Sequence, residues 1–110
     1  MAELVRKIAL LGMGTVGSGV YNIIEKQKEE MPFKVGAELE IVKVLVRNKA
    51  KYAEVVPAEK LTDNFEDVIN DDSIDMVVEV MGGIEPARTY IKAALEKGKH
   101  VVTANKDLMA

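Results

Sequence analysis

Short apolar runs alternate along this chain with segments whose apolar residues recur every three or four positions. Runs of the first kind are typical of buried strands in a parallel sheet, and the second spacing is typical of helices with one buried face. We expect strands at residues 5–11, 39–46, 61–62, 74–81 and 100–103. We expect helices at residues 16–31, within 50–59, at 65–69, at 86–97 and from 104 to 110.

Proline, asparagine and glycine mark where these helices begin and end. Pro32 ends the first helix because proline lacks an N–H donor. Asn64 is suited to cap the helix at 65–69, Pro86 to open the next one and Gly98 to end it. The residues expected on the buried faces of the two longest helices are Val16, Val20, Ile23, Ile24 and Met31, and Ala87, Tyr90, Ile91, Ala94 and Leu95.

Strands that alternate with helices at this rhythm predict a Rossmann-type α/β fold, in which a doubly wound parallel sheet carries helices on both faces. The expected sheet has about five strands in the order 3-2-1-4-5. Ligands of such sheets bind outside the carboxyl ends of the strands, here beside strands 1 and 4. We expect residues 1–110 to form one domain.

A glycine-rich turn, Gly12-Met13-Gly14-Thr15-Val16-Gly17, joins the first strand to the first helix. In a G-x-G-x-x-G turn the first glycine permits a sharp bend, the second a close approach of the backbone to a pyrophosphate, and the third tight packing of helix on strand. The N–H groups at the start of the helix favour an anion. An ordinary glycine-rich turn is the alternative, but the position between strand and helix favours dinucleotide binding.

The end of the second strand carries basic rather than acidic residues. An NAD site commonly has an acid there for the adenosine ribose, whereas this chain has Arg47, Asn48 and Lys49, with Lys51 close by. A guanidinium can bind a 2′-phosphate through paired hydrogen bonds. A solvated basic loop is the alternative. The residues favour NADP as the cofactor, with NAD as a second possibility.

Two further clusters follow the fourth and fifth strands. Gly82 and Gly83 allow a cofactor to approach the backbone, although a plain strand-to-helix turn explains them nearly as well. Glu79 lies inside an apolar strand, so we expect it to have a structural partner. Thr103 ends the fifth strand, and Lys106 lies in the first turn of the expected last helix, where a cation opposes the helix dipole. That placement indicates either a functional amine or a lysine that points to solvent.

Composition narrows the function classes. The chain is 48% hydrophobic and 30% charged, which is typical of a globular protein, and its net charge of −3 argues against nucleic acid or a membrane surface as a partner. With no cysteine and one histidine, no disulfide, cysteine nucleophile or multi-histidine metal site is expected. No apolar run approaches the roughly 18 residues of a membrane span, and no signal peptide is evident. We therefore expect a cytoplasmic protein without a metal.

Four motifs together resemble homoserine dehydrogenase: GMGTVGSGV, LVRN, VVEVMGGIEPA and GKHVVTANKDLMA. The resemblance covers essentially the whole chain but only that family's N-terminal nucleotide-binding part. It implies NAD(P)-dependent interconversion of L-homoserine and L-aspartate 4-semialdehyde, on the route to threonine, methionine and isoleucine. The implied pyrophosphate residues are Gly12, Gly14, Thr15, Val16 and Gly17. The other implied contacts are Arg47 at the 2′-phosphate, Gly82, Gly83 and Thr103 at the nicotinamide half, and Lys106 as a catalytic amine.

The family's substrate-binding and dimer-forming domain, with its further catalytic lysine and aspartate, is missing from this chain. We therefore expect a truncated cofactor domain that binds NADP but does not turn over homoserine, from a parent enzyme that is a homodimer. Two alternatives stay open. One is the cofactor domain of another amino-acid or semialdehyde dehydrogenase, such as aspartate dehydrogenase. The other is a non-catalytic NAD(P)-binding module that senses redox state or recruits a partner.

Overall fold

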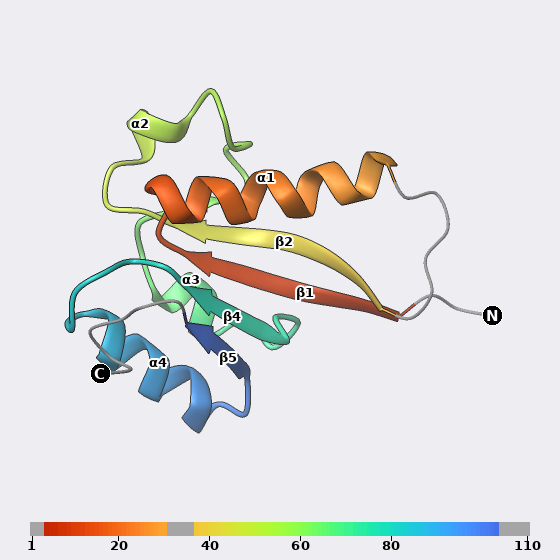
Figure 1. Cartoon of the computed structure of the whole chain (residues 1–110). Coiled ribbons are helices and arrows are strands. Elements are labelled where there is room, and N and C mark those ends of the chain that lie inside the picture. The colour runs from red at the N-terminus through yellow and green to blue at the C-terminus, as the bar shows by residue number, and fades with distance from the viewer. Residues whose placement is uncertain (1–3, 31–36, 104–110) are drawn as a thin grey trace.

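A computed structural model of the chain describes residues 4–30 and 37–103. Its centre is a parallel five-stranded sheet with the order β3-β2-β1-β4-β5, drawn in Figure 1. The strands are β1 (Leu4–Leu11), β2 (Ala37–Leu45), β3 (Leu61–Thr62), β4 (Met76–Glu79) and β5 (His100–Thr103). The predicted fold class and strand order are confirmed.

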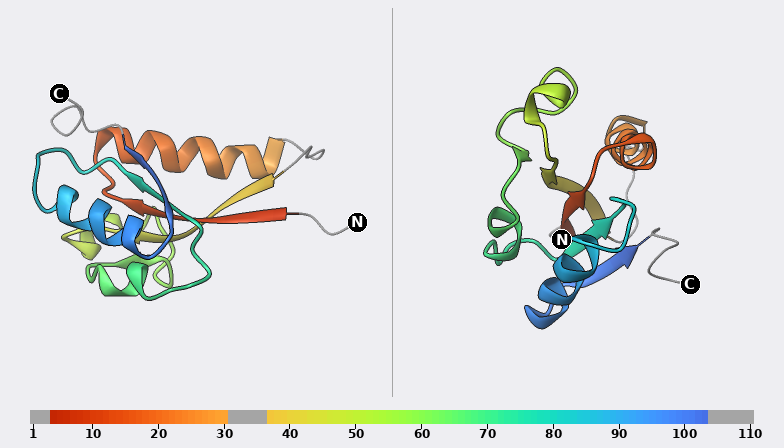
Figure 2. Two further views of the ribbon diagram at one scale, coloured as in Figure 1. Left: turned by 90° about the horizontal axis from the view of Figure 1, so that it is seen from below. Right: turned by 90° about the vertical axis from the view of Figure 1, so that its left-hand side faces the viewer.

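The helices cover both faces of this sheet, as predicted. They are α1 (Thr15–Glu30), α2 (Lys49–Tyr52), α3 (Glu66–Ile69) and α4 (Ala87–Glu96). Helix α1 lies along β1 and β2 on one face, whereas α3 and α4 lie on the opposite face (Figures 1 and 2). The carboxyl ends of the parallel strands meet at one edge, and the turns that follow them are therefore neighbours.

Strand β1 explains why the sheet is buried on both sides. Successive side chains of a strand point to opposite faces. Ile8 and Leu10 pack with Tyr21 and Ile24 of α1, whereas the intervening Ala9 and Leu11 belong to a second cluster. That second cluster also contains Val68 of α3 and Ala94 of α4. Because every residue from Ile8 to Leu11 is apolar, β1 contributes side chains to the hydrophobic clusters on both faces of the sheet.

The predicted buried faces of the helices need two corrections. Ile23 is 61% exposed and Leu95 is 57% exposed. In α1 Tyr21 is buried instead of Ile23, and it lies three positions before the buried Ile24 on the same side of the helix. Leu95 follows the buried Ala94 directly, so it points about 100° away from it. Met31, Pro32 and the side chain of Val16 lie outside what the structure describes.

Most helices and strands begin and end within one or two residues of the predicted positions, but the fourth strand is shorter than predicted. It was expected at 74–81 but covers Met76–Glu79, and the Ile74 N–H donates to Asp71 O in the turn before it. Pro86 precedes α4 rather than opening it. Gly98 follows that helix with φ of 78°, as a terminal glycine should. The helix expected from 104 lies outside the described residues.

Lys99 is a buried cation that the sequence did not indicate. Its side chain is 7% exposed, between α4 and β5. The ammonium group donates to the carbonyl oxygens of Asp71 at 2.7 Å and Ile74 at 3.0 Å. These bonds tie the turn before β4 to the start of β5. Lys99 lies at the amino end of both strands, so we assign it to the fold rather than to a site.

Candidate functional site

The glycine turn after β1 is held against the ends of two neighbouring strands. The Gly12 N–H donates to Leu45 O of β2 at 2.9 Å, and Gly12 has φ of 102°. A Cβ at this position would lie 3.1 Å from the Met81 Cα and 3.2 Å from the Val80 carbonyl oxygen. Both the left-handed backbone and the close approach therefore require glycine here.

The two later glycines of the turn meet different surroundings. A Cβ on Gly17 would lie 2.6 Å from the Gly12 carbonyl oxygen, so this glycine lets α1 pack directly on the turn. A Cβ on Gly14 would meet nothing within 4 Å. The Ser18 hydroxyl fixes the turn by donating to Met13 O at 2.6 Å. The exposed backbone at Gly14, beside the first N–H groups of α1, is therefore accessible to an anion.

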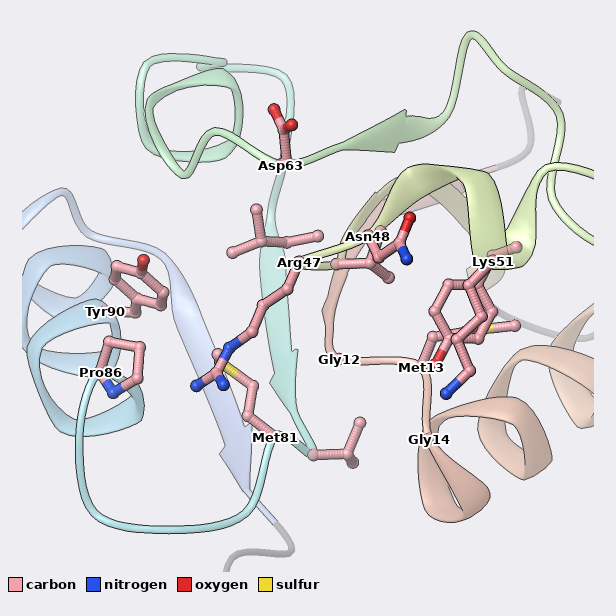
Figure 3. A pocket seen from close by; sticks show the side chains of 14 residues that line it. Gly12, Met13, Gly14, Arg47, Asn48, Lys51, Asp63, Met81, Pro86 and Tyr90 are labelled. Carbon is pink, nitrogen blue, oxygen red and sulfur yellow. The ribbon is translucent and has the colours of Figure 1, made fainter.

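A pocket of about 420 Å³ opens beside this turn, at the carboxyl edge of the sheet. It combines Gly12 and Gly14 with residues that follow β2, β3 and β4, and Figure 3 shows their arrangement. Of the residues predicted from the sequence for cofactor binding, the pocket brings together Gly12, Gly14, Arg47 and Asn48. It also includes Lys51, which the sequence placed close to them.

The basic side of the pocket comes from the segment between β2 and α2. Figure 3 shows the Arg47 side chain extending across the pocket toward Met81 and Pro86. The Asn48 side chain caps α2 by accepting the Ala50 N–H at 3.1 Å. Lys49 carries the same charge as Lys51 but is not among the lining residues. The pocket therefore offers an exposed guanidinium and an ammonium group to an anionic ligand.

The lining residues that the sequence did not indicate as part of a site include Tyr52, Asp63, Pro86 and Tyr90. The Tyr90 ring stacks on Phe65 with centroids 4.0 Å apart, which fixes one wall of the pocket. Asp63 directly follows β3. Asp63 could have been identified from the predicted strand order. Strands β2 and β3 are neighbours, Arg47 follows the carboxyl end of β2, and Asp63 follows that of β3.

The other predicted site residues lie at the ends of β4 and β5, outside the pocket lining. Gly82 and Gly83 are exposed and have φ of 79° and 74°. Glu79 is fully buried, and its carboxylate accepts the Thr103 hydroxyl at 2.5 Å and the Met81 N–H at 2.7 Å. The expected structural partner of Glu79 is confirmed. Lys106 lies outside the described residues.

Replacing Glu79 with alanine is expected to destabilise the chain by about 2–4 kcal/mol. The change leaves the Met81 N–H and the Thr103 hydroxyl without this acceptor and opens a cavity between β4 and β5. Denaturant unfolding measures the loss. Glu96→Ala, at an exposed position of α4, is the control and should stay within about 0.5 kcal/mol of the parent. Equal stability of the Glu79 and Glu96 variants would contradict the structural role.

Two groups with shifted pKa values lie away from the pocket. Burial, followed by the nearby Glu25 carboxylate, raises the pKa of Tyr21. The Ser73 hydroxyl, which donates to the Asp71 carboxylate at 2.5 Å, holds the pKa of Asp71 below its ordinary value.

The described residues contain no group of three His, Cys, Asp or Glu side chains that could hold a metal ion. None of the described helices is long and apolar enough to cross a membrane.

Comparison with known proteins gives concordant results. Residues 12–110 match the family profile described as homoserine dehydrogenase, NAD binding domain. The chain is 50% identical over 105 residues to homoserine dehydrogenase of Bacillus subtilis, covering 94% of the chain and 24% of that protein. A crystal structure of the Staphylococcus aureus homoserine dehydrogenase has a TM-score of 0.84 at 45% identity, covering 94% of this chain and 27% of the other.

A homoserine dehydrogenase structure from Thiobacillus denitrificans gives the same result. Its TM-score is 0.86 at 42% identity, and the match covers 98% of this chain and 25% of that one. The chain therefore spans about a quarter of the length of the relatives that it matches.

Proposed function

The chain belongs to the homoserine dehydrogenase family through its NAD-binding domain, and on this premise we propose that it is the cofactor-binding part of an enzyme that interconverts L-homoserine and L-aspartate 4-semialdehyde. The observation that carries the proposal is the pocket that joins the glycine turn to Arg47 at the carboxyl edge of the sheet. We include in the proposal a cytoplasmic, homodimeric parent enzyme that serves threonine, methionine and isoleucine synthesis.

The glycine turn fits the pyrophosphate of a dinucleotide. The backbone at Gly14 has no neighbour that a Cβ would meet within 4 Å, which leaves room for phosphate oxygens. The N–H groups of Thr15 and Val16, in the first turn of α1, point along a helix dipole that favours negative charge. Gly12 and Gly17 hold the turn close to β4 and to the helix, so these donors keep a fixed position.

We propose NADP as the preferred cofactor, with NAD as a weaker ligand. Arg47, which follows β2, would bind the 2′-phosphate through charge-assisted hydrogen bonds. Asn48 and Lys51 line the same pocket and would add a donor and a second positive charge. Lys49 adds positive charge nearby, without lining the pocket. This arrangement replaces the acid that an NAD site commonly has at the end of the second strand.

The reactive half of the cofactor would lie beyond the pocket, at the ends of β4 and β5. When bound, the nicotinamide ring supplies the hydride chemistry. Gly82 and Gly83 would let that half approach the backbone, and Thr103 would border it, held in place by the buried Glu79. Oxidation of an alcohol also needs a base for the hydroxyl proton. We propose Lys106, in the segment that follows β5, as the amine that handles this proton.

Calorimetric titration of the chain with NADPH and with NADH tests the proposal. We expect both to bind, NADPH about tenfold more tightly because of the charge-assisted contacts to its 2′-phosphate. Because residues 1–110 span about a quarter of the length of the relatives, we expect these residues alone to give no homoserine-dependent NADPH production. Inorganic phosphate serves as the control for unspecific anion binding. Failure of both dinucleotides to bind, or turnover of homoserine by the chain alone, would contradict the proposal.

A further inference from the structure

The rim of the pocket carries a carboxylate that the proposed binding mode does not use. Of the described residues that line the pocket, Asp63 alone is acidic. Its side chain is exposed, and no hydrogen bond or ion pair to another described residue engages it. Figure 3 shows Asp63 above the start of the Arg47 side chain, Tyr90 to the left of it, and Gly14 and Lys51 to the right. A carboxylate in a pocket for an anionic ligand needs an explanation.

Hydrogen bonds across the strand ends place Asp63 next to Arg47. The Gly12 N–H donates to Leu45 O, and the Val46 N–H donates to Thr62 O, both at 2.9 Å. The ends of β1, β2 and β3 are therefore linked in series. Arg47 follows Val46 directly and Asp63 follows Thr62 directly, so the two charged residues are neighbours across β2 and β3. A ligand group held by Arg47 also meets the field of Asp63.

The turn that carries Asp63 is braced on both sides. The buried Thr62 hydroxyl accepts the Asn64 N–H at 3.1 Å and donates to the Asp67 carboxylate at 2.5 Å. The Asn64 side chain accepts the Glu66 N–H at 3.0 Å and so fixes the start of α3. Asp63 itself contributes none of these bonds. The turn that holds Asp63 at the edge of the pocket therefore does not depend on the Asp63 carboxylate.

We propose that Asp63 sets the balance between the two dinucleotides at the proposed cofactor site. Its carboxylate accepts a hydrogen bond from the 2′-hydroxyl of an unphosphorylated adenosine ribose, and it repels the 2′-phosphate that Arg47 attracts. Arg47 favours NADP and Asp63 opposes that preference, so the site accepts both cofactors. This inference rests on the proposed function, since it assumes that the adenosine half binds beside Arg47.

The Asp63→Asn variant tests this role, because it removes the charge and keeps the shape of the side chain. Dissociation constants for NADPH and NADH are measured by calorimetry for the parent chain and the variant. NADPH should bind severalfold more tightly, since the repulsion is lost, and NADH severalfold more weakly, since an amide is a poorer acceptor than a carboxylate. The ratio of the two constants is expected to shift about tenfold or more toward NADPH.

The control is Asp72→Asn, which removes the same charge from an exposed turn outside the pocket and should leave the ratio unchanged. An equal change in affinity for both cofactors in the Asp63 variant would overturn the inference, as would an unchanged ratio. These outcomes leave the proposed function intact, because the parent chain still binds both dinucleotides. A parent chain that binds neither cofactor would overturn both proposals.

Discussion

Replacing Gly17 with alanine is expected to cost about 3 kcal/mol of stability and to weaken NADPH binding by on the order of 100-fold. The new Cβ would lie 2.6 Å from the carbonyl oxygen of Gly12 and 3.0 Å from its carbonyl carbon. Both atoms belong to the backbone, so no side chain can rotate away. Helix α1 must move off the turn, and its N–H groups then no longer point at the proposed pyrophosphate position.

Two neighbouring glycines provide matched controls for this substitution. A Cβ on Gly19, in the same helix, meets nothing within 4 Å, so Gly19→Ala should raise stability by about 0.5–1 kcal/mol and leave binding unchanged. A Cβ on Gly14 also meets nothing, so Gly14→Ala should change stability by less than about 0.5 kcal/mol. Its methyl group would nevertheless fill the space that the phosphates need.

Unfolding in denaturant gives the stabilities, and titration with NADPH gives the affinities. The three variants should differ. Gly17→Ala should lose both stability and NADPH affinity, Gly14→Ala should lose NADPH affinity alone, and Gly19→Ala should lose neither. A Gly17 variant as stable as the Gly19 variant would show that helix and turn are not packed as closely as the structure has them. Unchanged binding in the Gly14 variant would remove the pyrophosphate from this turn.

The layered fold could be predicted because its signals are local and repeated. The run from Ile8 to Leu11 is apolar at every position, which is typical of a strand buried on both faces. Alternation of such runs with helical segments then restricts the topology to a parallel sheet. Rules for the connections give the strand order, and the observed order agrees with them.

Burial on individual helix faces was harder to predict, since spacing alone does not say which face turns inward. Ile23 and Ile24 are adjacent and equally apolar, and only the packing of Tyr21 beside Ile24 selects the buried one. Lys99 shows a second limit. A lysine is buried here because two carbonyl groups at distant positions accept its hydrogen bonds, and no local pattern encodes them.

The parts of the candidate site that could be predicted are those formed by residues close together in the sequence. The glycine turn combines strand end, bend and helix start in six residues, and Arg47 follows a strand whose place in the sheet was clear. Asp63 and Tyr90 reach the pocket from β3 and α4, which are separated from the turn in sequence. Their contribution depends on how strand ends meet at one edge, so it becomes visible only in three dimensions.

Replacing Arg47 with alanine is expected to weaken NADPH binding by about 10- to 100-fold and to change NADH binding by less than about threefold. Arg47 directly follows Val46 at the end of β2, where the adenosine ribose of a dinucleotide would lie, and it lines the pocket. NADPH differs from NADH by the 2′-phosphate alone. Loss of a group that binds this phosphate must therefore separate the two affinities, whereas a disturbed pocket would weaken both.

Lys49→Ala is the matched control for Arg47, because it removes the same charge from the adjacent helix without altering the pocket lining. Its effect on NADPH should stay near twofold, since salt screens an exposed charge that makes no contact. Arg47→Lys should recover only part of the affinity, because an ammonium group lacks the planar pair of donors. Equal losses of NADPH and NADH affinity in the Arg47→Ala variant would remove this residue from the phosphate site. The basic end of β2 would then be a solvated loop, and the preference for NADP would need another source.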